Sequence, residues 1–384
     1  FASGTVPRIA FSPPPMTITE FKVMTTFYDA ALGHTSGAII NMNTQSGTDH
    51  YHGELHEFFG SNFLTANLFF AHRSNQKPAS YIANRYGGAI GGPVILPHLY
   101  NGDKGTKKTF FYYVFEGNKW GTPGTFTGTV PTVAERTGDF SALLALGPNY
   151  AIYNPFSTVL LGNGLYQRNA FPNNIIPANS GLLNGTALKL LQLYPLPNAP
   201  GTAGGVNNYI QGDVSDIENY YTHFLRIDHN FSDRSRMFLR MDYDNWDEKE
   251  LADCGVTDPA GGNHDGRNDA GLALDEVYII NPSTIFDFRY GVTAQMFPNM
   301  PLNTVDLSSY GFSSGFTSLF PAKAGLPIMT FTNYSQLGDV IAPLGYQSSL
   351  IHSFSGSVTE LIRSHTLHYG LDFRVERANG GPYT

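Results

Sequence analysis

The chain has 384 residues with a formal net charge of −8, and only 14% of its residues are charged. This length allows one large all-β domain or two medium ones, and the lack of a basic region argues against nucleic acid as a partner. The many Gly, Tyr and Phe residues favour strands and tight turns over helices.

The single cysteine, Cys254, excludes an internal disulfide framework and a cysteine-based zinc cluster. We expect it to be an ordinary loop residue. The sequence has no run of about 18 apolar residues, so it predicts no membrane helix. A β-barrel in a membrane stays compatible with this composition, because its apolar residues occur only at every second position.

Residues 1–48 differ from the rest of the chain. Residues 18–23 alternate as a short strand, and residues 33–41 predict a tight turn into another strand. A segment of this length is too short to bury a core of its own. We therefore expect it to pack against the remainder of the protein.

From residue 50 onward the apolar pattern has a period of two, which is typical of strands. The clearest runs span residues 235–244, 284–295 and 366–376. Less regular strands are predicted at residues 50–59, 82–95, 109–118, 218–231, 271–280 and 347–361. This makes about nine strands, with a possible short helix at residues 187–193 in a loop. The clearest runs have about ten residues, the length that a tilted strand needs to cross a bilayer.

The predicted connections alternate between short and long. Tight turns are predicted at residues 232–234, 281–283 and 363–364, and long links at residues 60–81, 119–217, 248–270 and 297–346. Short turns at one rim and long loops at the other are typical of outer-membrane barrels. A soluble sandwich usually places long loops at both ends.

Alternation alone fits both a membrane barrel and a soluble sandwich. Charges of both signs on one face, Arg240 with Asp242 and Arg289 with Asp287, favour a wet barrel interior. In a barrel, Phe286, Phe288, Leu371 and Phe373 point outward from a single curved sheet. If they pack between two sheets, the alternative applies, a soluble or surface-attached β-rich protein that binds carbohydrate or mediates adhesion.

Several stretches resemble, in order, the Oar-like branch of TonB-dependent outer-membrane receptors. The stretch from Gly37 to Phe59 resembles the junction between plug and barrel, at Thr44, Ser46, Gly47, Thr48 and Gly53. Later matches lie at residues 84–94, 108–117, 129–141, 175–178, 193–198, 226–233 and 365–374. Together they are specific for the branch and carry no information about the transported substrate.

This resemblance implies an all-β fold, a partial antiparallel transmembrane β-barrel of about nine of about 22 strands. Residues 1–48 would be the C-terminal part of the plug domain, and residues 49–384 the N-terminal part of the barrel with long extracellular loops. The implied location is the outer membrane of a Gram-negative cell, in contact with outer-membrane lipid. The implied function is transport of an unidentified substrate, gated by the plug and energised through the TonB complex, without a cofactor and without enzymatic activity.

The ends of the chain suggest a fragment. Phe1 is not an initiator methionine, and residues 380–384 are typical of the start of a loop. We expect the signal peptide, the TonB-contacting segment, the front of the plug, about half of the barrel and the terminal aromatic strand to be missing.

A glycine-rich strand is the first candidate site. Gly87, Gly88, Gly91 and Gly92 allow close backbone approach, and no phosphate-binding lysine motif follows them. We expect this strand to make room for the plug.

Acidic residues give a weak candidate for a metal site. Asp242, Asp244, Asp247 and Glu248, followed by Glu250 and Asp253, are hard oxygen ligands of the kind that Ca²⁺ prefers. Their spacing is not that of an EF-hand, so a solvated acidic loop is the favoured interpretation.

Histidines of the first predicted barrel strand give another conceivable metal site. His50, His52 and His56 share one face of this strand with Glu54. We interpret them as polar residues facing the lumen or the plug, and expect no metal ion there.

Residues 311–315 match the G-x-S-x-G pattern of serine hydrolases. That chemistry needs the serine on a sharp strand-to-helix turn beside a histidine. We expect a flexible loop with no following helix, and no histidine next to Ser313.

Overall fold

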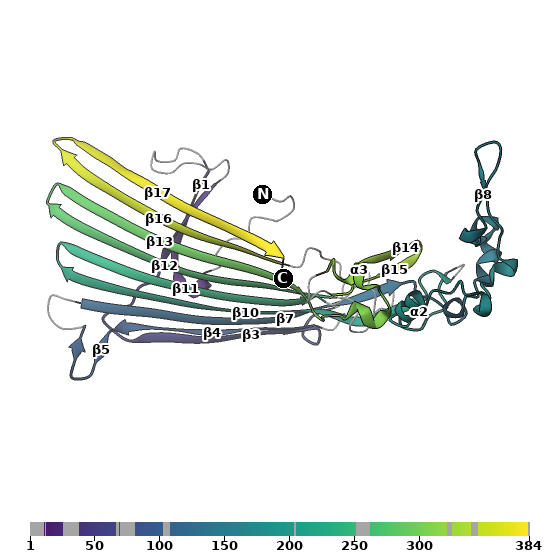
Figure 1. Ribbon diagram of the computed structural model, residues 1–384. Helices are drawn as coiled ribbons and strands as arrows, with labels where there is room; N and C mark the ends of the chain where they lie inside the picture. Colours follow the sequence, from purple (N-terminus) through teal and green to yellow (C-terminus); the bar gives the residue numbers. More distant parts are fainter. Residues whose placement is uncertain are drawn as a thin grey trace.

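The computed structural model describes residues 11, 13–25, 38–66, 69, 81–102, 108–202, 205–250, 262–320, 325–338 and 345–382. Cys254, Asp253 and residues 33–37 of the predicted turn and strand at residues 33–41 lie outside these residues. Nine long antiparallel strands form one curved sheet (Figure 1), in the order β17-β16-β13-β12-β11-β10-β7-β4-β3. Their bounds are β3 His52–Ser61, β4 Ile82–Pro93, β7 Lys108–Gly128, β10 Tyr209–Ser232, β11 Ser235–Glu250, β12 Asn263–Asn281, β13 Thr284–Pro301, β16 Gly345–Ile362 and β17 His365–Pro382.

All nine predicted strands are present, and each long strand pairs with the next one along the chain. The sheet is therefore an antiparallel meander, open in the described residues with β3 and β17 as its edges. This confirms the predicted all-β class and the partial barrel. No helix in the described part of the chain is long and apolar enough to cross a membrane.

The strands extend further than predicted, which corrects the bounds of three long loops. Pairing between β7 and β10 continues to Gly128 and Tyr209, and pairing between β12 and β13 continues to Asn263 and Pro301. β11 likewise runs on to Glu250, inside the predicted loop 248–270. The period-two pattern fades in these extensions, because Gly, Thr, Pro and Asn replace the apolar residues of one face. Backbone hydrogen bonds to the neighbouring strand hold them instead.

Short and long connections separate to opposite ends of the sheet (Figure 1). The three predicted tight turns join β10 to β11, β12 to β13, and β16 to β17. Arg363 in the last turn has a φ of 56°. The link from β4 to β7 lies at the same end and contains the small strands β5 Ile95–Leu96 and β6 Tyr100–Asn101.

The long connections after β7 and β13 carry small elements. Strands of two to four residues are β8 Val159–Leu160, β9 Tyr166–Gln167, β14 Met329–Phe331 and β15 Tyr334–Leu337. The α-helices are α2 Gly185–Leu191, which confirms the predicted short helix, and α3 Ser314–Thr317. Short 3₁₀ helices occupy Glu135–Thr137, Ser141–Leu146, Pro148–Tyr150, Pro155–Ser157, Pro172–Asn174, Ala178–Ser180 and Leu307–Tyr310.

The register divides the strand residues between two faces. One row across the sheet joins Arg226, Arg240, Ala273, Gly291, Ser353 and Arg374. The adjacent row, on the opposite face, joins Leu225, Met241, Leu272, Val292, His352 and Val375. We call the polar face with Arg226 the inner face and the apolar face the outer face.

The outer face is covered by no second sheet in the described residues. Phe286, Phe288, Leu371 and Phe373 share this face by register, and Leu371 and Phe373 are 75% and 59% exposed. The single-sheet prediction is therefore confirmed, and a two-sheet sandwich is wrong. Two histidines on this face pair with tyrosine hydroxyls: His223 with Tyr113 at 2.7 Å and, in the same way, His352 with Tyr290 at 2.9 Å. Each of these two histidine nitrogens thus finds a partner on a mainly apolar part of the surface.

Candidate functional site

The N-terminal segment, which we define as the described residues of 11–48, lies against the inner face. It contains a 3₁₀ helix, Pro15–Thr17, and a hairpin of β1 Ile18–Met24 with β2 Ile39–Thr44. Met16 packs on a small core formed by Ala89, Tyr112, Val114 and Phe224. The Tyr112 hydroxyl donates a hydrogen bond to the Met16 carbonyl at 2.9 Å.

Arg226 holds the end of this segment. Its guanidinium donates to the carbonyl and the side-chain oxygen of Thr44 at 2.9 and 2.8 Å. The same group pairs with Asp228 at 2.7 Å and stacks over the ring of Phe238. Asp228 and Phe238 orient the arginine, so that its remaining donors point at Thr44.

Gly47 lies close to the backbone of the sheet. A Cβ atom at this position would lie 2.2 Å from the carbonyl oxygen of Phe111 on β7. Gly53 has a similar but looser restriction, 2.7 Å from the carbonyl oxygen of Ala89. Only glycine fits at position 47 without moving backbone atoms.

The remaining predicted junction residues make fewer contacts. Ser46 is half-buried. The Thr48 hydroxyl donates to the carbonyl of His50 at 2.9 Å, a local turn contact. Of the five predicted junction residues, Thr44 and Gly47 make the contacts that tie the segment to β7 and β10.

Strand alternation divides the four predicted glycines of β4. Gly87 and Gly91 share the inner face with Ala89, which packs against Met16. Gly88 and Gly92 point to the outer face, where their Cβ positions fall on the side chains of Leu55 and Tyr51. An added Cβ at Gly87 or Gly91 would meet atoms of the neighbouring strands, at Phe115 and Tyr112. The expected room for the N-terminal segment at these two glycines therefore stays a prediction.

The inner face carries ion pairs along its whole length. Arg240 pairs with Asp242 at 2.9 Å and Arg289 with Asp287 at 3.3 Å, which confirms both predicted pairings. Arg85 pairs with the buried Glu116 at 2.8 Å. Charges of both signs compensate one another on this polar surface.

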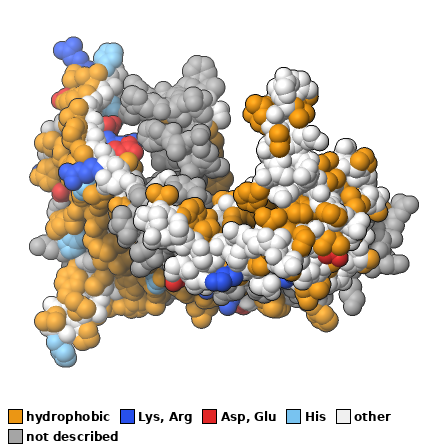
Figure 2. All heavy atoms as spheres, turned by 45° about the vertical axis from the view of Figure 1, so that its right-hand side comes forward, with side chains coloured by type: hydrophobic (Ala, Val, Ile, Leu, Met, Phe, Trp, Pro, Cys, Tyr) orange, Lys and Arg blue, Asp and Glu red, His pale blue; other side chains and the backbone are white. Residues whose placement is uncertain are grey.

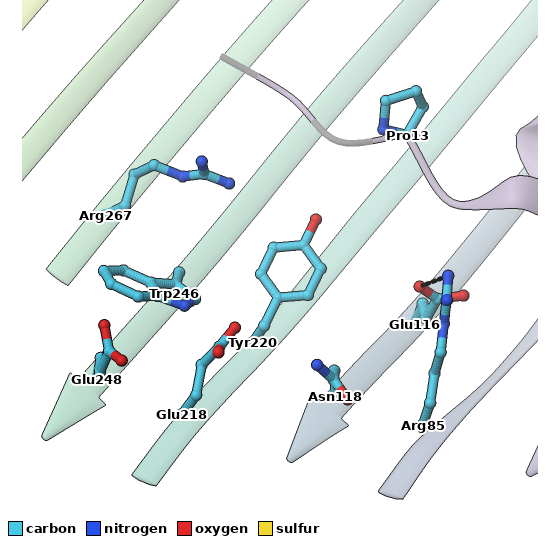
Figure 3. Close-up of a pocket in the computed structure, with 9 residues that line it drawn as sticks. All are labelled: Pro13, Arg85, Glu116, Asn118, Glu218, Tyr220, Trp246, Glu248 and Arg267. Atoms are coloured by element: carbon cyan, nitrogen blue, oxygen red, sulfur yellow. Dashed lines mark hydrogen bonds and ion pairs between the residues drawn. The ribbon is translucent and has the colours of Figure 1, made fainter. Parts of the chain in front are cut away.

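A cavity of about 520 Å³ lies on the inner face, between the N-terminal segment and the loop end of the strands (Figure 3). Tyr220 and Trp246 lie directly opposite each other on β10 and β11. One step nearer the loops, Glu218 and Glu248 are also directly opposite. The complete lining is Pro13, Arg85, Glu116, Asn118, Glu218, Tyr220, Trp246, Glu248 and Arg267. This arrangement can bind a small polar ligand through stacking and charge.

The cavity was not predicted from the sequence, apart from Glu248. Its signal was present in two alternating stretches, where an aromatic residue and an acid stand two positions apart. Tyr220 follows Glu218, and Trp246 precedes Glu248, in opposite chain directions. Antiparallel pairing places Tyr220 opposite Trp246 and Glu218 opposite Glu248. This could not be known before the register of the two strands was known.

The predicted acidic metal site is divided by alternation. Asp242, Asp244 and Glu248 lie on the inner face, whereas Asp247 lies on the outer face, where it contacts His264. Asp244 lies opposite Asp269, and both are buried. Among the described residues, no group of three or more His, Cys, Asp or Glu is placed to hold a metal ion.

The histidines of β3 stay separate as well. His52 and His56 share the inner face with Glu54. His56 lies 3.6 Å from Glu116, and the side chain of His50 is mainly exposed.

Ser313 begins a helix, which corrects the expectation that no helix follows the G-x-S-x-G stretch. Its hydroxyl accepts a hydrogen bond from the backbone N–H of Phe316 as the N-cap of α3. Serine is a preferred N-cap residue, so this contact accounts for the serine without a catalytic role.

The two long connections pack together into a cap with its own hydrophobic core. This core consists of Val130, Leu190, Tyr194, Leu307, Leu326 and Leu337. The amide of Asn208 bonds both backbone groups of Val130 at 2.8 Å, and the Lys189 ammonium donates to the Ser309 carbonyl at 2.8 Å. The connection after β7 and the connection after β13 therefore form one structural unit.

The stretch at residues 129–141 supplies the framework of this cap. The Glu135 carboxylate accepts from the backbone N–H of Thr132 at 2.7 Å and from the Tyr334 hydroxyl at 2.9 Å. Burial, together with the Glu135 charge, raises the pKa of Tyr334. Arg136 donates to the carbonyls of Tyr194 and Pro195, and burial lowers its pKa. These contacts are internal to the cap.

Replacing Arg136 with alanine is expected to destabilise the cap by about 2–3 kcal/mol, because buried carbonyls lose a charged donor. Hydrogen exchange should then accelerate in residues 129–208 and stay unchanged in β11 to β13. Arg168→Ala is the matched control, because that guanidinium makes one exposed bond, to Thr158 at 3.0 Å. Equal acceleration in both variants would contradict the role of Arg136.

An arm formed by residues 141–182 projects from the cap (Figure 1), and Figure 2 shows hydrophobic side chains at its projecting end. Phe156, Leu160, Leu165 and Tyr166 are 82%, 62%, 63% and 71% exposed. Between Asp139 and Lys189 the chain has a single charged residue, Arg168. The arm is thus an apolar, nearly uncharged projection.

Comparison with known proteins gives one family. Residues 43–383 match the outer membrane beta barrel domain family. The match begins at the end of β2 and includes all nine strands of the sheet. No curated protein matches the chain.

Proposed function

We propose, from the premise that this chain belongs to the outer membrane beta barrel domain family and lies in the outer membrane, that it is part of a TonB-dependent transporter of the Oar-like branch. In this proposal the N-terminal segment is the end of a plug. The sheet is part of the barrel wall, with lipid on its outer face and the lumen on its inner face. The plug closes the lumen until TonB, using the proton motive force, displaces it.

The observation that carries this proposal is the way the N-terminal segment contacts the inner face. Among the described residues, its contacts with the sheet include the ring of Phe11 at Gly271, Met16 on a small core, Thr44 on Arg226, and Gly47 on the backbone of Phe111. Most residues of the β1–β2 hairpin are exposed rather than packed on the sheet. A segment held this way can leave the wall without unfolding the sheet, as a gate must.

A labelling experiment in cells tests the gate. In a Cys254→Ser background, Asn41→Cys places a thiol in β2, at a cavity between the segment and the sheet. A membrane-impermeant maleimide added outside should label it in cells with active TonB, and labelling should fall at least tenfold after deletion of TonB or addition of an uncoupler.

Asn163→Cys serves as the control, because residue 163 is exposed between β8 and β9 on the arm. Its labelling should be the same under all conditions. If the Asn41→Cys thiol reacts equally with and without TonB, the protein is not a TonB-dependent transporter.

A further inference from the structure

Two aromatic rings are neighbours in the wall of the cavity beside Pro13. Tyr220 and Trp246 lie directly opposite each other on β10 and β11, and both side chains line the cavity (Figure 3). Side chains in this relation are separated by roughly 5 Å between their Cβ atoms. The pair therefore offers an apolar surface to a ligand that has a flat face or a face rich in C–H groups.

Planar polar side chains surround these two rings on the inner face. They continue the same row across the sheet or lie in the adjacent rows, and they are Arg85, Glu116, Asn118, Glu218, Glu248 and Arg267. A guanidinium only donates hydrogen bonds, a carboxylate only accepts them, and an amide does both. A ligand that fits this lining has donors and acceptors around an apolar face.

Most of the charged groups in the lining are engaged with other groups of the protein. Arg85 donates to Glu116 at 2.8 Å, and Arg267 pairs with Asp269 at 3.0 Å. Arg267 and Glu248 also make further interactions within the chain. A charged ligand would have to share or break these contacts. A neutral ligand can use the N–H groups and lone pairs of Arg85 and Glu116 that their ion pair leaves over.

We propose that this cavity binds a neutral sugar of one or two rings. The C–H face of the sugar stacks on Tyr220 and Trp246. Its hydroxyls bond to the side chains of Arg85, Asn118 and Glu218. Because each hydroxyl both donates and accepts, one ligand satisfies the guanidinium, the amide and the carboxylate together. This inference rests on the proposed transport function, because it names the substrate class of the same lumen.

The size and position of the cavity suit such a ligand. A volume of about 520 Å³ lies within the range of small-molecule sites, roughly 300–1,000 Å³. Pro13 of the N-terminal segment is part of the lining (Figure 3), so a bound sugar contacts this segment as well as the wall of the sheet.

Fluorescence titration of the purified full chain, in a detergent without a sugar headgroup, tests the proposal. The chain has two tryptophans, so Trp120→Phe leaves Trp246 as the only one and makes the signal specific to the cavity. At least one of the neutral disaccharides cellobiose, maltose and lactose should change the emission saturably. Its affinity should change less than twofold when salt is raised, because no net charge is screened. Agmatine, a cation, and citrate, an anion, should bind at least tenfold more weakly.

Ring variants measured by calorimetry with the tightest of these sugars locate the site. Trp246→Leu should weaken binding at least tenfold, whereas Trp246→Phe keeps a flat ring and should weaken it less. Tyr220→Leu should also weaken binding at least tenfold. Tyr221→Leu is its matched control, because Tyr221 is the next residue on β10, lies on the outer face and is outside the lining. Its affinity should equal that of the wild type.

The neutral-sugar site would be overturned if none of the three disaccharides bound, or if agmatine or citrate bound as tightly as the sugar. It would also be overturned if Tyr220→Leu and Trp246→Leu bound the sugar like Tyr221→Leu. The proposed transport is tested separately by Asn41→Cys labelling in cells. Labelling that depends on TonB without sugar binding would leave the transporter standing, and sugar binding without TonB-dependent labelling would leave only the site.

Discussion

Replacing Leu274 with arginine is expected to destabilise the folded protein in a bilayer by about 2–4 kcal/mol. Leu274 lies on the outer face, four positions from Tyr278 and four from Ala270, which pairs with Tyr243. Tyr278 and Tyr243 are amphipathic side chains suited to the two membrane interfaces. At about 3.3 Å per residue, the row between them covers about 26 Å along the strand, and a tilt of about 40° leaves about 20 Å of the roughly 25 Å apolar band. Leu274 lies at the centre of this row.

The control for this prediction is Ser353→Arg. Ser353 belongs to the neighbouring row on the inner face, at the same height, and lines a cavity of about 710 Å³. An arginine there has space and faces the polar lumen, so unfolding in urea from lipid vesicles should change little. Equal destabilisation by both variants would show that the two faces are not lipid and lumen.

Replacing Gly47 with alanine is expected to raise the permeability of the outer membrane. The added Cβ would lie 2.2 Å from the Phe111 carbonyl oxygen, so the segment or β7 must shift. Overpacking of this kind costs about 1–3 kcal/mol, which corresponds to a change of about 5- to 150-fold in the open population. Uptake of a membrane-impermeant dye by cells measures this change.

Gly121→Ala is the matched glycine. It lies on β7, the same strand as Phe111, and an added Cβ meets nothing within 4 Å. Dye uptake should stay at the wild-type level in this variant. If cells with the Gly47→Ala protein take up no more dye than cells with the wild type, the contact at Phe111 does not hold the gate closed.

The strands were predictable because every second side chain of a strand faces the apolar outer surface, which leaves a period of two in the sequence. The run from Thr366 to Glu376 alternates without interruption, and it forms the first eleven residues of β17 after His365. The extensions beyond it were not predictable. Residues such as Thr122 and Gly124 on β7 have no preferred face, and only pairing with Asp216 and Val214 makes them strand.

The functional site was harder to predict for a geometric reason. Gly47 was singled out by its resemblance to a junction, but its partner, the carbonyl of Phe111, has no sequence signature. The pairing of Glu218 with Glu248 depends on a register across a turn of two residues, so a shift of one position would move Glu248 to the other face. The four aspartates and glutamates near residue 245 likewise looked contiguous, until alternation moved Asp247 away from the rest.

The arm carries a single charge, Arg168, beside the exposed Phe156, Leu160, Leu165 and Tyr166. Any contact made through these four side chains would be hydrophobic, so added salt should weaken it little and sulfate should strengthen it.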